Sequence, residues 1–525
     1  AHTMTSSSST SSSSPWGSTT TTTIVSLGVG VVTGAYLVLQ LQKQRRLPQH
    51  QTKSTDSTAL TKLRQLFSSS SSSSSVTSTK LSGSSNQTGA GTTTTTNRNR
   101  FYYLDYNGTT PVYEEVFDAM VPYFKEHYGN PSSSHRMGTE PRKAIDESRR
   151  TILTTLLGCS PREKSLDESS IWMCGCGTEA DNLAIQLALQ SDTRHDSGSG
   201  DGGGGTAGKN TGNKPHVVTT NVEHPAVELY LKYLEEELGV VDVTYVPVDG
   251  EGRVSAKDVL DAITDDTILV TVMLANNESG SLQPVREIAT GCRDRGVLMH
   301  TDAAQAAGKV SIHLEDIGHP DMISIVGHKI GAPKGIAALY VRPSCLFEEE
   351  HGRKLSHNHG IMLIGGGQEF GRRGGTENTP YIVGLGKAAE LAEKRLDTNA
   401  RHMEKMRSRL LYNLQAKLDG DAKIRVNGPT DPSKRLPNTL SVGFDSVHSG
   451  ALLSTLSQVV AASAGATCHG TGSVSSVLMA MKVPLNYARG TLRLSLGPGT
   501  TAADVDEASK IIADAVKDQW AAAAQ

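Results

Sequence analysis

The chain has little cysteine and little net charge for its length. Six cysteines, at positions 159, 174, 176, 292, 345 and 468, are spread over 525 residues, and the formal net charge is -3. Their spacing forms no disulfide framework, and a chain this long needs none, so a reducing compartment is the simpler expectation. Cys174 and Cys176 have no second pair at ligand spacing, which argues against a metal site.

The charge is unevenly distributed along the chain. The first 104 residues contain nine Lys or Arg and a single acid, Asp56, so the rest of the chain is acidic. An acidic folded body argues against nucleic acid as the main partner.

The first 101 residues are expected to be a low-complexity region, because their long Ser and Thr runs cannot bury a core. Within them, residues 24–41 are uncharged and apolar and are followed by Lys43, Arg45 and Arg46. This length is near the lower limit for a span of about 20 residues. The basic flank favours a membrane anchor with the body on the cytosolic or matrix side.

Two other interpretations of this region remain open. Its Ser-rich, acid-poor composition is also typical of an organelle transit segment, and an apolar stretch can be a cleaved signal. The signal interpretation lacks a basic region before the stretch. The sequence therefore predicts a membrane-anchored protein with a cytosolic body, or a mitochondrial one.

From residue 102 onward, short apolar runs alternate with segments of helical periodicity, which predicts an α/β fold with a mostly parallel sheet. Strands are expected at 216–220, 241–246, 268–274, 297–300, 322–326 and 336–341, and helices at 178–190, 225–238, 256–262 and 285–295. We expect a large domain over 102–385, with a flexible insertion at 191–214, and a smaller α+β domain over 386–525.

Lys329 is the first candidate for chemistry. It follows the apolar run 322–326 directly, and Gly331, Pro333 and Gly335 then interrupt the chain. Open α/β sheets bind ligands at the carboxyl ends of their strands. A lysine at that place is a candidate Schiff-base former rather than a solvated surface charge.

Polar side chains follow other predicted strands. Their functional groups would suit an aromatic cofactor with a pyridine ring. Asp302 could hold the ring nitrogen protonated, and Gln305 and Asn277 could contact its phenolic oxygen. His224 could stack on the same ring and move protons. Each residue alone is more often structural, and the weight comes from the complementary set at one sheet edge.

Gly177 and Thr178 open a predicted helix directly after the apolar run 171–173. Backbone N–H groups at a helix start bind anions, and the Thr178 hydroxyl adds a donor; an ordinary helix cap is the alternative. An amine, a carboxylate and a phosphate loop together are the groups that pyridoxal 5'-phosphate requires.

A series of motifs in this order resembles the class V aminotransferase group that contains cysteine desulfurases and selenocysteine lyases. The motifs are YLDYNGTTP, GNPSSSH, CGCGTEADN, NVEHPAV, MLANNESG, HTDAAQAAGK, VGHKIGAPKG, GGGQEFGRRGGTENTP and TLRLSLG. The resemblance covers residues 102 to about 518 and implies the fold type I of pyridoxal-phosphate enzymes.

The resemblance also implies roles for individual residues. Lys329 would bind the cofactor covalently, His328 would join Gly177 and Thr178 at the phosphate, and Thr376 would reach the phosphate of a neighbouring subunit in a homodimer. Arg493 and Asn130 would bind the substrate, with the Arg493 guanidinium on its carboxylate; a strand-edge salt bridge is the alternative for Arg493.

The resemblance places the family's catalytic cysteine at Cys468, in a loop rich in small residues before a predicted helix at 474–482. A mobile loop suits a cysteine that takes sulfur from a substrate, and a helix start favours the thiolate. The alternative is a small buried hydrophobe.

One departure bears on the substrate. Val326 stands three residues before Lys329, where many desulfurases have Ser, and this favours the selenocysteine-lyase branch. The expected reaction removes selenium or sulfur from L-selenocysteine or L-cysteine and gives L-alanine, with a protein as the acceptor. Alternatives are a cysteine desulfurase for iron–sulfur clusters or tRNA thiolation, an aminotransferase, and an inactive membrane-tethered scaffold.

Overall fold

The computed structural model describes residues 100–160, 167–192, 213–342, 344, 362–418, 423–464 and 474–524. They belong to one compact unit, Thr95–Gln525. The predicted low-complexity region and apolar stretch 24–41 lie outside the described residues, so the anchor stays a prediction. Among the described helices, none has the length and apolar character needed to cross a bilayer.

A seven-stranded sheet forms the centre of this unit, in the order β2-β8-β7-β6-β5-β3-β4. All neighbours pair in parallel except β8, which is antiparallel to both β2 and β7. The strands are β2 (Ile171–Cys174), β3 (His216–Thr220), β4 (Asp242–Val246), β5 (Thr267–Thr271), β6 (Leu298–Asp302), β7 (Met322–Val326) and β8 (Ala337–Val341). The mixed, mostly parallel sheet expected from the alternation of strands and helices is confirmed.

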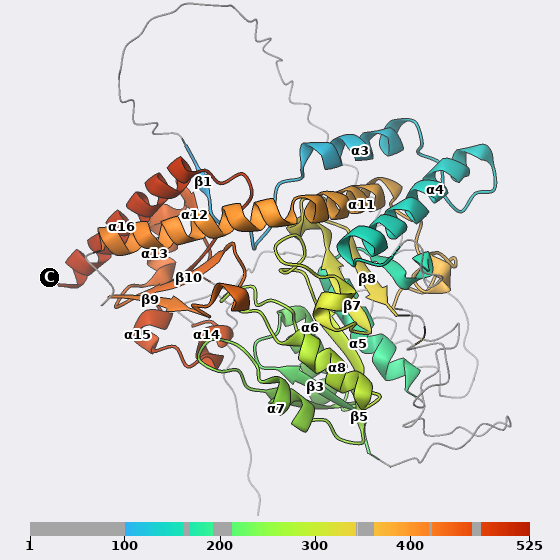
Figure 1. Ribbon diagram of the computed structural model, residues 1–525, viewed down its shortest axis with the longest axis horizontal. Helices are drawn as coiled ribbons and strands as arrows, with labels where there is room; N and C mark the ends of the chain where they lie inside the picture. The colour runs from blue at the N-terminus through green and yellow to red at the C-terminus, as the bar shows by residue number, and fades with distance from the viewer. Residues whose placement is uncertain are drawn as a thin grey trace, which may run out of the picture. The chain divides into compact units, whose positions relative to one another are not determined.

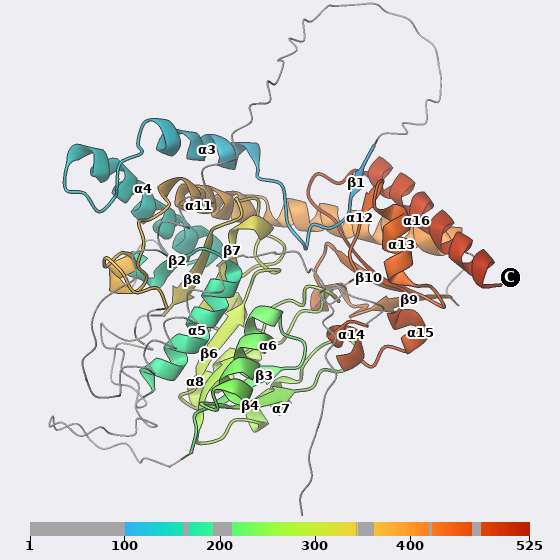
Figure 2. The same ribbon diagram turned by 180° about the vertical axis from the view of Figure 1, so that it is seen from behind.

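Helices cover both faces of this sheet, because its strands are apolar on both sides. Successive residues of β7 face opposite cores: Met322 packs with α5 (Gly177–Ser191) and α6 (Pro225–Lys232). Ile323 packs with the other core, which also contains residues of the helices on that face. These helices are α3 (Glu114–Lys125), α4 (Arg136–Thr151), α8 (Val285–Asp294) and α11 (Thr379–Lys394). Figures 1 and 2 show the sheet between these two sets of helices.

A second, three-stranded antiparallel sheet has its own apolar core. It consists of β9 (Ile424–Asn427), β10 (Thr439–Phe444) and β12 (Thr491–Ser495), covered by α12 (Leu396–Lys417), α13 (Ser449–Leu456) and α16 (Ala502–Ala523). The short strand β1 (Tyr102–Tyr103) pairs with β11 (Val460–Ala461) beside it (Figure 1). Tyr102 and Leu104 therefore pack in this core. The domain boundaries at 101 and 385 stay a prediction.

The predicted helix 225–238 differs in detail from the structure. Its first part is α6, and its last turn, Tyr233–Glu237, is π-helical. The remaining short helices are α7 (Ala256–Asp261), α9 (Leu314–Ile317), α14 (Ser476–Ala480) and α15 (Leu485–Ala488). Hydrophobic periodicity predicts that this segment is helical. It does not predict that the backbone hydrogen bonds of the last turn join residues five apart, as in a π-helix, rather than four apart.

Gly331 allows the sharp turn after Lys329. It has a φ of +91°, and an added Cβ would lie 2.4 Å from Cδ2 of Tyr113, whose backbone N–H donates to the Gly331 carbonyl at 3.0 Å. We expect Gly331→Ala to lower the free energy of unfolding by about 1–3 kcal/mol, measured by urea denaturation. Gly250→Ala, where an added Cβ meets nothing within 4 Å, is the control and should change it by less than about 0.5 kcal/mol. Equal stability of the two variants would contradict this account of the turn.

Candidate active site

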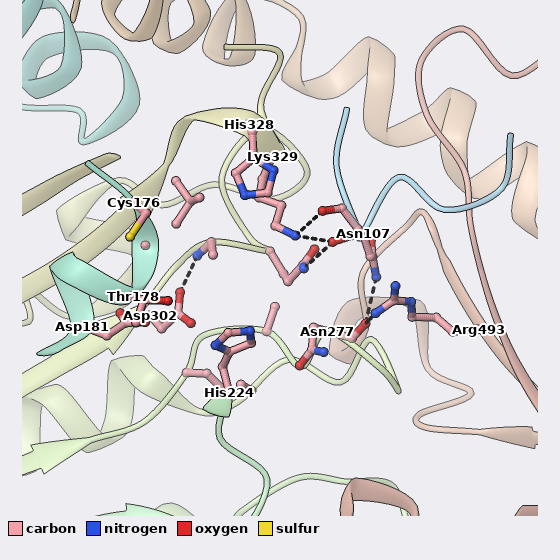
Figure 3. A pocket seen from close by; sticks show the side chains of 17 residues that line it. Asn107, Cys176, Thr178, Asp181, His224, Asn277, Asp302, His328, Lys329 and Arg493 are labelled. Carbon is pink, nitrogen blue, oxygen red and sulfur yellow. Dashed lines mark hydrogen bonds between the residues drawn. The ribbon is translucent and has the colours of Figure 1, made fainter. Parts of the chain in front are cut away.

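A cavity of about 320 Å³ lies at the carboxyl ends of the parallel strands. Its walls come from the start of α5, the loops after β3, β5, β6 and β7, the segment after β1, and β12 (Figure 3). Its lining residues include nine of the predicted site residues: Gly177, Thr178, His224, Asn277, Asp302, Gln305, His328, Lys329 and Arg493. Segments far apart in the sequence thus meet at one sheet edge, as expected for a parallel sheet.

Lys329 extends into the cavity from the single 3-10 turn that follows β7. Its Nζ donates hydrogen bonds to the carbonyl oxygens of Asn107, at 2.5 Å, and Gly108, at 2.8 Å (Figure 3). Burial, and then the charge of Arg493, lower the pKa of Lys329 to about 8. The amine is therefore much closer to its neutral, nucleophilic form at neutral pH than an ordinary lysine.

Asp302, the last residue of β6, presents its carboxyl group to the same cavity. Its Oδ1 accepts a hydrogen bond from the Ala304 N–H at 2.8 Å. Burial raises the pKa of Asp302, while His224 and Lys329 oppose that shift. A buried carboxyl group of this kind is stabilised as an anion when a cation is placed against it, and a protonated ring nitrogen is such a cation.

His224 is the N-cap of α6, and this fixes its tautomer. Its Nδ1 accepts a hydrogen bond from the Ala226 N–H at 3.1 Å, so in the neutral ring the proton is on Nε2. Burial lowers the pKa of His224, which keeps the ring neutral. A neutral imidazole on the cavity wall can pack against an aromatic ring and exchange a proton through Nε2.

The start of α5, where the phosphate is predicted to bind, lies in the wall of the cavity. Gly177 lies against β7, where an added Cβ would be 2.6 Å from Cγ2 of Val326. Val326 thus requires glycine here, and the backbone of Gly177 and Thr178 forms the cavity wall. His328 also lines the cavity, with Nδ1 3.1 Å from the Thr109 hydroxyl, and burial lowers its pKa to about 4.

Arg493 on β12 brings a guanidinium group to the cavity. Its Nη2 forms an ion pair with Asp105 Oδ1 at 2.6 Å, and its Nη1 donates to the Asn277 carbonyl at 3.2 Å. Its buried Nε has no hydrogen-bond partner among the described residues. The strand-edge salt bridge therefore exists, and the same side chain also faces the cavity.

Two predicted site residues, Asn130 and Thr376, do not line this cavity, and the position of a third is not described. Asn130 is exposed, and its side chain accepts the Ser132 N–H at 2.9 Å in a local turn. Thr376 is exposed as well, and its predicted contact requires a second subunit. Cys468 lies outside the described residues. The roles of all three stay predictions.

Residues that the sequence reasoning did not single out also shape the site. Asn107 is 1% exposed and its carbonyl accepts the Lys329 amine. Glu179 Oε2 accepts a hydrogen bond from the Gly175 N–H at 2.7 Å, and its Oε1 accepts one from Arg373 Nε at 2.8 Å. Glu179 therefore connects the 362–378 segment to the start of α5. The only available signal was that Asn107, Glu179 and Arg373 lie within the recognised motifs.

These groups fit pyridoxal phosphate. The cavity combines an amine of lowered pKa, a buried carboxyl group and a glycine-containing helix start, which suit the aldehyde carbon, the ring nitrogen and the phosphate of that cofactor. Fold and site together define a pyridoxal-phosphate enzyme of fold type I.

Comparison with known proteins identifies the family within this class. The chain matches the family profile "Aminotransferase class-V" over residues 102–197 and 205–508. It is 40% identical over 417 residues, 79% of this chain and 92% of the relative, to a cysteine desulfurase of Trichormus azollae. It is 36% identical over 417 residues to the cysteine desulfurase IscS of Clostridium botulinum (strain Hall), covering 79% of this chain and 94% of that protein.

Solved structures agree with this assignment. A NifS-like protein superposes with a TM-score of 0.66 at 32% identity and covers 80% of this chain and 100% of its own. A protein titled SspA in complex with cysteine gives a TM-score of 0.58 at 31% identity, over 76% of this chain and 100% of that one. The chain belongs to the class V aminotransferase family and uses pyridoxal phosphate.

Glu223, next to His224, provides a test of the electrostatics beneath the site. It is 5% exposed, its Oε1 accepts the Thr220 hydroxyl at 2.6 Å, and burial raises its pKa from 4.5 to about 8. Between pH 4.5 and about pH 8, the Glu223 carboxyl group is protonated in the folded state and ionised in the unfolded state. The contribution of protonated Glu223 to the free energy of unfolding is therefore fully present below pH 4.5 and is lost as the pH rises through about 8.

Glu223→Gln cannot ionise, so we expect it to gain stability relative to the original protein as the pH rises from about 5 to about 8. The gain should be at most about 1.4 kcal/mol per pH unit, measured by urea denaturation at several pH values. The exposed Glu237→Gln is the matched control and should show no such trend. A stability difference for Glu223→Gln that is constant across this pH range would contradict the protonated, buried Glu223.

Proposed function

We propose that this protein is a cysteine desulfurase, which removes sulfur from L-cysteine and releases L-alanine. The observation that supports it most is the Lys329 amine in a cavity shared with Asp302 and Arg493. The curated relatives support the same reaction, because cysteine desulfurases of two organisms match nearly their whole length. They favour this activity over the selenocysteine lyase that Val326 suggested.

Each residue then has a task in the reaction. Bound pyridoxal phosphate supplies an electron sink for the bonds of the substrate's α-carbon. Lys329 holds or returns a proton at Nζ, and its pKa of about 8 suits this task near neutral pH. Asp302 supplies negative charge at the pyridine side, and His224 a neutral ring with a proton on Nε2.

Arg493 orients the substrate. Its guanidinium group is fixed by Asp105 and by the Asn277 carbonyl, and it faces the cavity through donors that match a carboxylate. Asn130 is proposed as a further substrate contact.

Cys468 is the proposed sulfur acceptor. Its thiolate attacks the substrate sulfur, the carbon–sulfur bond breaks, and Cys468 becomes a persulfide while the alanine carbon gains a proton. A homodimer, in which Thr376 contacts the partner's phosphate, and a protein that receives the persulfide sulfur complete the proposal.

Selenocysteine lyase is the second candidate, and Val326 is the observation that favours it. Val326 is 5% exposed, lines the cavity and packs against Gly177, so it gives no hydroxyl to the phosphate site. A selenol is a better leaving group than a thiol, so a lyase would depend less on Cys468.

The two candidates separate in one assay. The full-length protein is loaded with pyridoxal phosphate, and alanine release is measured from L-cysteine and L-selenocysteine, with Cys468→Ala alongside. We expect Cys468→Ala to lose at least about 100-fold of its turnover of L-cysteine, because its nucleophile is gone. Cys159→Ala, a cysteine outside the cavity lining, should keep its activity.

Strong preference for L-selenocysteine, with turnover that survives in Cys468→Ala, would replace the desulfurase by the lyase. Absence of alanine from both substrates, with the cofactor bound, would reject both candidates and favour another reaction such as transamination.

A further inference from the structure

Lys309 is a buried lysine just beyond the cofactor cavity, and the mechanism does not use it. It is 5% exposed and lies in the turns after β6. Its Nζ donates to the Gln305 carbonyl oxygen at 2.9 Å and lies 3.5 Å from the Gln305 side-chain oxygen Oε1. No ion pair joins it to a carboxylate of the described residues. An unpaired buried ammonium is costly, and burial together with the charge of Lys329 lowers the pKa of Lys309 to about 7.

The Gln305 side-chain amide has one contact on each side. Nε2 of Gln305 donates to the Asn107 carbonyl at 3.0 Å, while Oε1 faces Lys309. In the reversed amide, the NH2 group would face the donor of Lys309 and the oxygen would face the Asn107 carbonyl. Both contacts would be repulsive, because one would pair two donors and the other two acceptors. The amide orientation is therefore determined by the hydrogen-bonding groups of Lys309 and Asn107.

The same carbonyl oxygen also accepts the amine of Lys329. Figure 3 shows Lys329 directed toward Asn107, and the Gln305 Nε2 donates to the same carbonyl. A second, small cavity of about 20 Å³ is lined by both Lys309 and Lys329. This volume holds about one water molecule. The side chains of Lys309 and Lys329 are therefore linked in two ways: by the hydrogen bonds through Gln305 and Asn107, and by the small cavity that both of them line.

We propose that Lys309 is a positioning residue that holds the Gln305 amide with Nε2 toward the Asn107 carbonyl and the cofactor cavity. Lys309 is not among the described residues that line the cofactor cavity, and it acts through Gln305. The inference rests on the cofactor site of the proposed function and does not depend on which amino acid the enzyme uses.

The test is a double-mutant cycle of Lys309→Met and Gln305→Leu on the full-length protein. The readouts are the dissociation constant for pyridoxal phosphate of the cofactor-free protein, the absorbance maximum of the bound cofactor, and the urea midpoint. We expect each single variant to weaken cofactor binding about 3- to 10-fold and to shift the absorbance in the same direction. The double variant should be no worse than the poorer single one, because Lys309 acts through Gln305.

Two further variants keep the test decisive. Lys309→Arg retains a cationic donor and should restore most of the affinity and the absorbance, which a loss of packing alone would not explain. The exposed Lys510→Met is the control and should change nothing. Additive effects in the double variant, or a change in the urea midpoint with unchanged affinity and absorbance, would overturn the proposal. The readouts use no turnover, so a failed desulfurase assay would leave this result interpretable.

Discussion

The hydrogen bonds of Asn107 connect the parts of the site. Its carbonyl oxygen accepts hydrogen bonds from Lys329 and Gln305, which lie in the turns after strands of the seven-stranded sheet. Its side-chain Nδ2 donates to the Asn277 carbonyl at 3.1 Å. Its backbone N–H donates to Ser495 Oγ of the three-stranded sheet at 2.9 Å. Because the residue is buried, each of these groups needs its partner, and the segment after β1 is therefore fixed between the two sheets. The position of the reactive amine follows from that constraint.

Much of the fold could be predicted because local patterns agree with the final structure. The runs 216–220 and 322–326 coincide with β3 and β7, since buried parallel strands are continuous apolar runs. The pairing of β1 with β11 could not be predicted, because two-residue strands some 360 positions apart leave no local pattern. The end of β5 was also predicted too late: after Thr271 the chain stays apolar but leaves the ladder.

The site was predictable where its residues follow strand ends. Asp302, Lys329 and His224 each follow or end a parallel strand, and such ends share one edge of the sheet. Asn107 and Lys309 were not predicted, because their importance depends on contacts with distant residues and on burial. Lys309, unlike Lys329, does not directly follow an apolar run, so nothing in its sequence context marked it as buried.

The proposed reaction depends most directly on Lys329 as the residue that binds the cofactor covalently. The measurement is the visible absorbance of the full-length Lys329→Ala protein after incubation with pyridoxal phosphate and removal of the excess, with circular dichroism to verify folding. If Lys329 binds the cofactor, Lys329→Ala will be folded but will lack the absorbance band of covalently bound cofactor, while Lys510→Ala keeps that band. A folded Lys329→Ala protein that retains the full band would contradict this role of Lys329.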